Sequence, residues 1–163
     1  MDKDQIGLYI HIPFCRQKCY YCDFPSYPGM EGFWGPYTEA LVNELVMKAE
    51  EYDHPDIGTI FIGGGTPTLI PSGYISGIME AVYRYYNVSQ DCEITIESNP
   101  GTLTDEKLKD YAECGINRIS IGLQAYQDDI LKRIGRIHTS DDFKNAVKLA
   151  QKHGFININA DII

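Results

Sequence analysis

The sequence predicts an α/β protein built on a parallel β-sheet, and two observations support this prediction. Short apolar segments alternate four times with longer segments of helical period, and a fifth apolar segment ends the chain. Repeated strand–helix–strand units produce parallel sheets, because each helix returns the chain to the edge where the previous strand began. A closed or partial barrel and an open doubly wound sheet both fit this alternation.

Five segments are expected to form the strands, because each is short, apolar and bounded by polar residues or glycine. They are residues 7–12, 59–62, 93–98, 118–122 and 157–162. The sequence stops within the last of these segments. We therefore expect residues 1–163 to be the N-terminal part of a larger core domain, with the rest of that domain and a C-terminal domain following.

Four helices are expected between the strands, at residues 36–52, 72–86, 104–115 and 140–154. Ser72, Thr104 and Ser140 are expected to cap the starts of the last three helices, since their hydroxyl groups can accept from free backbone amides there. Gly115 and Gly154 are expected to end the last two helices, because glycine readily takes the left-handed conformation of a helix end.

The chain is acidic, with a formal net charge of −9 and a pI of about 4.8. A general nucleic-acid surface needs clustered Lys and Arg, so no nucleic-acid partner is expected. No apolar run reaches the roughly 18 residues of a membrane span, and the N-terminus lacks the pattern of a signal peptide. We therefore expect a cytoplasmic protein without a transmembrane segment.

Unusual polar and glycine residues occur at or just after the end of each predicted strand. Three cysteines follow the first strand, and the run GGGTPT at residues 63–68 follows the second. Glu97 lies near the end of the third strand, Gln124 follows the fourth and Asp161 lies in the fifth. Because reactive groups of parallel α/β folds gather at the carboxyl ends of the strands, the sequence predicts a functional site at this rim.

Cys15, Cys19 and Cys22 form the strongest chemical signal in the sequence. Thiolates are soft ligands that suit zinc or an iron–sulfur cluster. Zinc would need a fourth ligand, for which His11 is the nearest candidate. A four-iron cluster held by three cysteines would leave one iron open to another ligand. The remaining two cysteines lie outside this loop and are expected to be structural.

Other candidates each admit a plain structural alternative. Gly64 and Gly65 would let a ligand approach the backbone, or would serve only a tight turn. Glu97 could bind an amine or ribose hydroxyls, or face solvent as most glutamates do. Arg136 and His138 could pair with a carboxylate, or lie in a surface turn.

The cysteine loop resembles the radical S-adenosylmethionine signature, Cys15-x3-Cys19-x2-Cys22 with the aromatic Tyr21 directly before the third cysteine. The segments LYIHIPFCRQKCYYCDF, IFIGGGTPT, ESNPGTL, GINRISIGLQ and IGRIH are similar to the oxygen-independent coproporphyrinogen III oxidase family and its haem-chaperone relatives. The resemblance extends over residues 8–163. It implies a partial (β/α)6 barrel, similar to a TIM barrel, of which this chain would supply the first five strands.

The resemblance also implies two cofactors. Cys15, Cys19 and Cys22 would hold a [4Fe–4S] cluster, and S-adenosyl-L-methionine would bind its open iron. An electron from the reduced cluster would cleave the sulfonium C–S bond and yield a 5′-deoxyadenosyl radical, so an electron donor is an expected partner. The positions that match the family's S-adenosylmethionine contacts are Tyr9, Tyr21, Gly64, Gly65, Thr66, Glu97, Gln124, Arg136 and Asp161.

Two differences separate this chain from the oxidases of that family. The oxidases carry a further cysteine two residues after the third, where this chain has Phe24, and they have a longer arm before the cluster. The resemblance therefore implies the haem-chaperone branch, whose members bind haem or porphyrin and pass haem to an acceptor protein. An oxidase that decarboxylates coproporphyrinogen III in porphyrin biosynthesis is the alternative, and a zinc-binding structural module is another.

Overall fold

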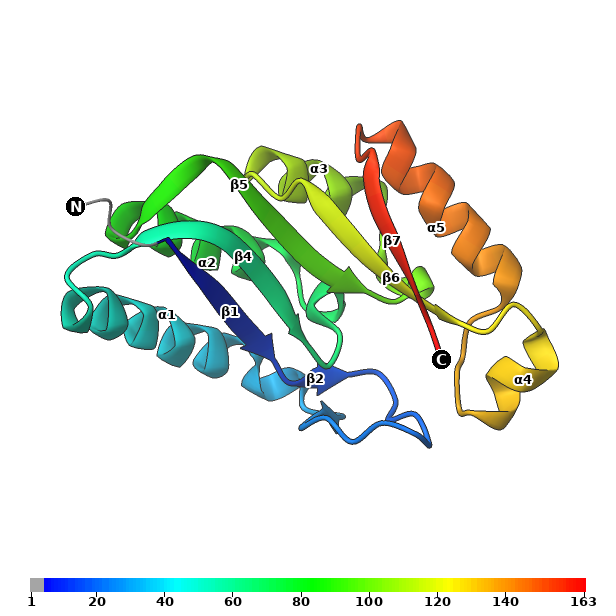
Figure 1. Ribbon diagram of the computed structural model, residues 1–163. Helices are drawn as coiled ribbons and strands as arrows, with labels where there is room; N and C mark the ends of the chain where they lie inside the picture. Colours follow the sequence, from blue (N-terminus) through cyan, green and yellow to red (C-terminus); the bar gives the residue numbers. More distant parts are fainter. Residues whose placement is uncertain (1–4) are drawn as a thin grey trace.

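A five-stranded parallel sheet forms the framework of the protein (Figure 1), and the computed structural model describes residues 5–163. The strands pair in the order of the chain, so that β1 lies at one edge and β7 at the other. A doubly wound sheet would reverse its strand order at a switch point. The unbroken order therefore favours the barrel type. The strands are β1 (Ile6–Ile12), β4 (Asp56–Gly64), β5 (Asn87–Ser98), β6 (Arg118–Gln124) and β7 (Asn157–Ile162).

The helices α1, α2, α3 and α5 lie along one side of the sheet, whereas α4 lies beyond the carboxyl end of β6 (Figure 1). Successive helices pack against each other, α1 on α2 and α2 on α3. This arrangement follows when every crossover has the same hand. It leaves the other face of the sheet free to carry a site. The helices are α1 (Trp34–Glu51), α2 (Ser72–Tyr85), α3 (Asp105–Glu113), α4 (Asp128–Arg133) and α5 (Ser140–Lys152), with short 3-10 turns η1 (Glu31–Phe33), η2 (Pro67–Leu69) and η3 (Pro100–Thr102).

Isoleucines at alternate strand positions form the core between the sheet and the helices, and each is at most 3% exposed: Ile10, Ile12, Ile60, Ile62, Ile94, Ile96, Ile119 and Ile121. Burying one such side chain stabilises the fold by about 1.5–3 kcal/mol. Successive strand residues point to opposite faces, so the residues between these isoleucines occupy the other face. That face carries mostly polar residues and glycine, among them Glu97, Ser120 and Asp161.

Several strands and one helix differ from the sequence prediction. β4 begins at Asp56 and β5 at Asn87, several residues before the predicted starts. Both were shortened in the prediction because their first residues are polar or interrupted by glycine, and β4 has an irregular register between Ile57 and Thr59. The helix α4 was not predicted, because it has six residues and is too short to show a period.

The predicted helix ends agree with the structure at three positions. The Thr104 hydroxyl accepts from the Lys107 backbone amide at 3.2 Å and caps α3. Gly115 and Gly154 follow α3 and α5 with φ angles of 89° and 85°, in the left-handed region where glycine is favoured.

Two predicted caps were wrong. Ser72 is the first residue of α2, and its hydroxyl donates to the Asp110 carboxylate at 2.5 Å instead of capping the helix. Ser140 is likewise the first residue of α5, whose cap is Thr139. Thr139 and Asp142 form a reciprocal capping box, in which the Thr139 hydroxyl accepts from the Asp142 amide at 3.2 Å. Thr139 and Ser140 are adjacent residues of the same chemistry, so the sequence did not separate them.

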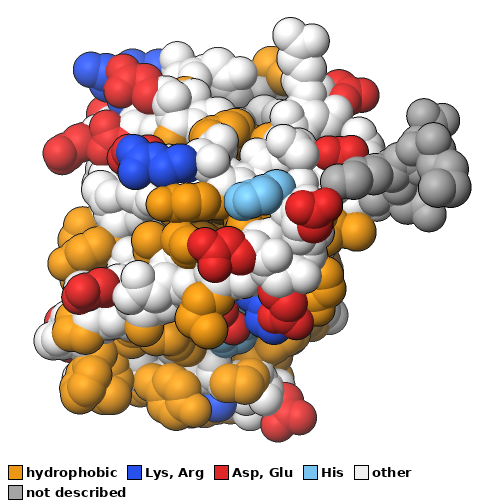
Figure 2. Space-filling model, turned by 90° about the vertical axis from the view of Figure 1, so that its left-hand side faces the viewer, with side chains coloured by type: hydrophobic (Ala, Val, Ile, Leu, Met, Phe, Trp, Pro, Cys, Tyr) orange, Lys and Arg blue, Asp and Glu red, His pale blue; other side chains and the backbone are white. Residues whose placement is uncertain are grey.

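Within residues 5–163, no helix has both the length and the apolar character that crossing a membrane requires. Figure 2 shows the side of the molecule that lies at the left in Figure 1. On this side, Lys and Arg side chains are scattered among acidic and apolar ones and form no large basic patch.

Candidate cofactor site

A closed loop carries the three clustered cysteines. It begins in β2 (Phe14–Cys15) and returns to β3 (Tyr27–Pro28), and these two short strands pair in parallel. The Tyr27 amide donates to the Pro13 carbonyl at 2.8 Å and closes the loop. The far side of the loop rests on the segment after α4, where the Tyr20 amide donates to the Ile134 carbonyl at 3.1 Å. These contacts give the loop a defined shape beside the carboxyl ends of the strands.

A cavity of about 290 Å³ lies between this loop and the rim of the sheet. All of the predicted site residues except Tyr9 line it. The prediction that these residues gather at one rim is therefore confirmed, while their individual roles remain predictions. The predicted residues in the lining are Cys15, Cys19, Tyr21, Cys22, Gly64, Gly65, Thr66, Glu97, Gln124, Arg136 and Asp161.

The three loop cysteines are free thiols that share this cavity. Burial raises the pKa of the Cys15 thiol, the nearby Thr66 and Ser26 hydroxyls lower it, and the Cys22 and Cys19 thiols raise it further. Among the described residues, no group of three or more His, Cys, Asp or Glu side chains is arranged to hold a single metal ion. Three soft donors around a shared space suit a cluster, in which each cysteine ligates a different iron.

The zinc alternative needs His11 as a fourth ligand, and the structure places both nitrogens of that ring in other contacts. His11 Nδ1 lies 3.0 Å from the Tyr9 hydroxyl, and Nε2 lies 3.1 Å from the Pro25 carbonyl. The ring also packs beside Gly64, where an added Cβ would lie 2.6 Å from it. His11 therefore has a structural role in joining β1 to the cysteine loop.

The glycine run after β4 brings bare backbone against the cysteine loop. Gly64 has a φ of 116°, a conformation that other residues rarely adopt. The Gly65 amide donates to the Ile12 carbonyl at 2.9 Å, and an added Cβ would lie 2.7 Å from the Phe14 carbonyl oxygen and 3.0 Å from Cys15 Sγ. The plain-turn interpretation of these glycines is therefore incomplete, because they also let two parts of the site meet.

Glu97 is a half-buried carboxylate inside the cavity. Burial raises its pKa, the Gly64 amide that donates to it at 3.0 Å lowers it, and the Asp161 carboxylate raises it. Two neighbouring carboxylates in a partly desolvated cavity favour a ligand with ammonium or hydroxyl donors. The solvent-facing alternative for Glu97 is not what the structure shows.

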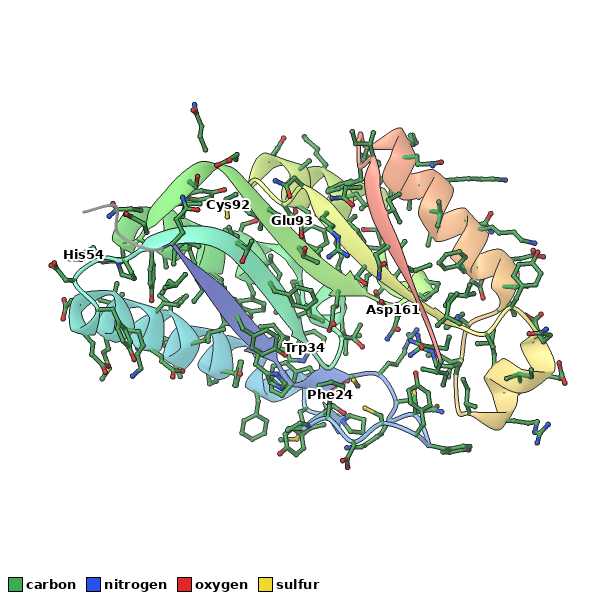
Figure 3. All side chains as sticks on the ribbon, viewed as in Figure 1. Phe24, Trp34, His54, Cys92, Glu93 and Asp161 are labelled. Carbon is green, nitrogen blue, oxygen red and sulfur yellow. The ribbon has the colours of Figure 1, made fainter. Side chains whose placement is uncertain are left out.

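Asp161 is held in place by side chains from neighbouring strand positions. The Ser120 hydroxyl lies 2.9 Å and 3.1 Å from its two carboxylate oxygens, and the Asn159 amide donates to Oδ1 at 2.7 Å. The carboxylate therefore has a fixed orientation at the rim (Figure 3).

Arg136 enters the cavity from the segment after α4. Its guanidinium donates to the Gly122 carbonyl at 2.7 Å and to Asn99 Oδ1, and Nη1 lies 3.6 Å from Cys19 Sγ. His138 points elsewhere: it is buried, and its Nε2 lies 3.2 Å from the Leu123 carbonyl. Burial lowers the pKa of His138, as does the neighbouring Arg136, so a neutral ring is favoured.

Sequence reasoning missed the roles of Gly122, Asn99 and the backbone of Gln124. A Cβ on Gly122 would lie 2.7 Å from Arg136 Nη2, so glycine lets the guanidinium take its present position against β6. A glycine inside a strand was the signal that could have found this close approach. Gln124 has a φ of 69°, and such strain in a non-glycine residue is typical of functional sites.

The remaining predicted residues lie at or beyond the margin of the cavity. Tyr9 lies in the middle of β1, the edge strand of the sheet, and is 54% exposed, with its ring stacked on Phe61. Phe24 lies in the cysteine loop (Figure 3) and is one of the residues that line the cavity. Cys92 is buried on β5, and the Cys114 thiol donates to the Tyr111 carbonyl at 3.4 Å beside α3. Neither Cys92 nor Cys114 lines the cavity.

The fold and this cysteine-lined rim define a class of protein. The family model described as "Radical SAM superfamily" matches residues 9–163, so the chain belongs to the radical SAM superfamily. Membership implies S-adenosylmethionine and a [4Fe–4S] cluster. The cavity fits this pair, because it offers three thiols, two carboxylates and bare glycine backbone. It also holds the buried Ser26 hydroxyl beside Cys15.

Within the superfamily, the chain is similar to proteins named as haem chaperones. It is 40% identical over 156 residues to the heme chaperone HemW of Bacillus subtilis, and this match covers 95% of this chain and 41% of that protein. It is 41% identical over 160 residues to the heme chaperone HemW of Escherichia coli, and this match covers 97% of this chain and 42% of that protein. The chain thus spans about two fifths of the length of these curated relatives.

A solved structure supports the placement in the radical SAM superfamily. The radical SAM enzyme coproporphyrinogen III oxidase (HemN) of Escherichia coli matches with a TM-score of 0.89 and 28% sequence identity, over 97% of this chain and 37% of that one. The partial-barrel prediction is therefore confirmed.

Proposed function

We propose that this chain is the N-terminal part of the radical SAM core of a haem chaperone, a protein that binds haem and transfers it to an acceptor protein. The observation that carries the proposal is the identity of about 40% to HemW proteins across nearly the whole chain. Phe24 supports it, since this exposed phenyl ring stands where the resembling oxidases place a further cysteine.

In this proposal, Cys15, Cys19 and Cys22 hold the [4Fe–4S] cluster and leave one iron for S-adenosylmethionine. A bound cluster would supply the electron that cleaves the sulfonium C–S bond. The chain's own residues bind and orient the cofactor: Gly64 and Gly65 admit it against the backbone, and Arg136, whose Nη2 already donates to Gly122 and Asn99, offers its remaining N–H groups to the cofactor's carboxylate. Glu97 and Asp161 accept hydrogen bonds from its amine or ribose hydroxyl groups.

The second candidate is an oxygen-independent coproporphyrinogen III oxidase, and the structural match to that enzyme from Escherichia coli favours it. This match covers 37% of the oxidase chain, the part that corresponds to the proposed cluster and S-adenosylmethionine site, which chaperones and oxidases of this family share. Phe24 counts against the oxidase, because a phenyl group cannot ligate metal, carry a proton or supply a thiol. The net charge of −9 does not separate the two candidates, because haem and coproporphyrinogen III are both anionic and either would need basic residues elsewhere in the whole protein.

We expect the full-length protein to bind haem and to lack oxidase turnover. Anaerobic incubation with coproporphyrinogen III, S-adenosylmethionine and a reductant should give no protoporphyrinogen IX by chromatography, whereas the Escherichia coli oxidase assayed in parallel should give product. A haem titration followed in the Soret band should saturate. Catalytic formation of protoporphyrinogen IX would overturn the chaperone proposal in favour of the oxidase. If the protein showed neither haem binding nor oxidase turnover, both proposals would fail and only the superfamily assignment would stand.

A further inference from the structure

A chain of hydrogen bonds joins two of the loop cysteines through Asn99. Arg136 Nη1 lies 3.6 Å from Cys19 Sγ, and Arg136 Nη2 donates to Asn99 Oδ1. Asn99 Nδ2 then donates to Thr66 Oγ1 at 2.8 Å, and Thr66 Oγ1 lies 3.5 Å from Cys15 Sγ. The Asn99 side chain therefore contacts both Arg136 and Thr66, which approach the sulfur atoms of Cys19 and Cys15.

The chemistry of these groups fixes the direction of each bond. A guanidinium only donates, so the Asn99 carbonyl oxygen must face Arg136 and its NH2 group must face Thr66. The Thr66 oxygen accepts from that NH2 group, which leaves its own hydrogen free for Cys15 Sγ. Each end of the chain therefore presents a hydrogen to a cysteine sulfur.

Asn99 is well placed to hold both neighbours, because its own backbone is fixed. The Asn99 amide lies 3.3 Å from Thr102 Oγ1, and the Asn99 carbonyl accepts from the Thr102 amide at 2.9 Å. Pro100 follows and restricts the turn. Thr66 is 2% exposed and Asn99 is half-buried, so water competes little for these hydrogen bonds.

We propose that Asn99 is a positioning residue that holds the Arg136 guanidinium and the Thr66 hydroxyl against the sulfurs of Cys19 and Cys15, and thereby raises the midpoint potential of the cluster. The inference rests on the proposed function, which places a cluster on these sulfurs. Reduction increases the negative charge on a cluster and its thiolates, and hydrogen bonds to the sulfurs stabilise the reduced form.

The first test measures the midpoint potential of the full-length protein after anaerobic reconstitution. At a fixed solution potential, Asn99→Ala should lower the ratio of reduced to oxidised cluster about tenfold, which corresponds to a midpoint potential about 59 mV lower for one electron. The matched control is Asn117→Ala. The Asn117 side chain also makes two hydrogen bonds of 2.8 Å, but at the opposite end of the sheet. The Asn117→Ala substitution should leave the midpoint potential of the cluster unchanged. If Asn99→Ala also left this potential unchanged, the inference would be overturned.

The second test asks whether Asn99 acts through its two neighbours. In a protein that already carries Thr66→Val and Arg136→Gln, adding Asn99→Ala should not shift the midpoint potential further. The hydroxyl and the guanidinium that Asn99 orients are already absent from that protein. A shift as large as in the otherwise unchanged protein would show that Asn99 acts on its own, and would overturn the inference.

A third measurement is independent of iron. In a crystal structure of metal-free Asn99→Ala, the Arg136 and Thr66 side chains should have moved away from Cys19 and Cys15, whereas in Asn117→Ala they should not. If the Arg136 and Thr66 side chains kept their positions in Asn99→Ala, the inference would be overturned, even if the protein without any substitution took up no iron. Failure of that protein to take up iron would instead overturn the proposed function, so the two failures are distinguishable.

Discussion

Replacing Cys15, Cys19 or Cys22 by alanine is expected to reduce the iron content of the reconstituted full-length protein from about four atoms per chain to nearly none. The three thiols line one cavity, and a cluster left with two of them has lost one of its three thiolate ligands. Iron and sulfide analysis, together with the visible absorption spectrum, measures the effect.

Cys92→Ala and Cys114→Ala are the matched controls for these variants. Both cysteines lie outside the cavity: Cys92 is buried on β5, and the Cys114 thiol is hydrogen-bonded to a backbone carbonyl beside α3. Each control should keep about four irons per chain, although loss of the buried Cys92 thiol would lower the free energy of unfolding somewhat. Equal loss of iron in a control and in Cys15→Ala would contradict the ligand assignment.

Gly65→Ala is expected to have the second-largest effect, and to act on both cofactors. The added Cβ would lie 2.7 Å from the Phe14 carbonyl oxygen, a backbone atom that cannot rotate away, and 3.0 Å from Cys15 Sγ. Relieving this overlap moves the first cluster ligand and costs about 1–3 kcal/mol. We expect lower iron content, and S-adenosylmethionine binding at least tenfold weaker by calorimetry on whatever cluster-loaded protein forms.

Gly77→Ala is the control for this substitution. Gly77 lies within α2, where an added Cβ would meet no atom within 4 Å. Alanine is the better helix former, so this variant should be slightly more stable and bind both cofactors normally. Normal iron content and normal affinity in Gly65→Ala would mean that the glycine run has no part in shaping the site.

Much of the framework could be predicted from the sequence, because its causes are local. Isoleucines such as Ile60 and Ile62 recur at every second position, and only a strand with one buried face gives that pattern. The location of the site could also be predicted, since residues at the ends of parallel strands must meet. Glu97 and Asp161 illustrate this, because the alternation of their strands and the parallel topology bring them to one cavity.

The details that were missed depend on partners distant in the sequence. Asn99 contacts Thr66 and Arg136, which are 33 and 37 residues away, and no local pattern reports such contacts. Gly122 is required by the position of the Arg136 guanidinium rather than by its own strand. The order of the strands, which separates a barrel from a doubly wound sheet, is equally non-local.

The central claim is that three cysteines hold a cluster whose open iron binds S-adenosylmethionine. Electron paramagnetic resonance of the reduced, reconstituted full-length protein tests it most directly, recorded with and without S-adenosylmethionine. We expect a reduced four-iron cluster signal whose shape and g-values change on addition of S-adenosylmethionine, because a ligand has reached an iron that no cysteine occupies. A cluster signal that stays the same at saturating S-adenosylmethionine would contradict the account.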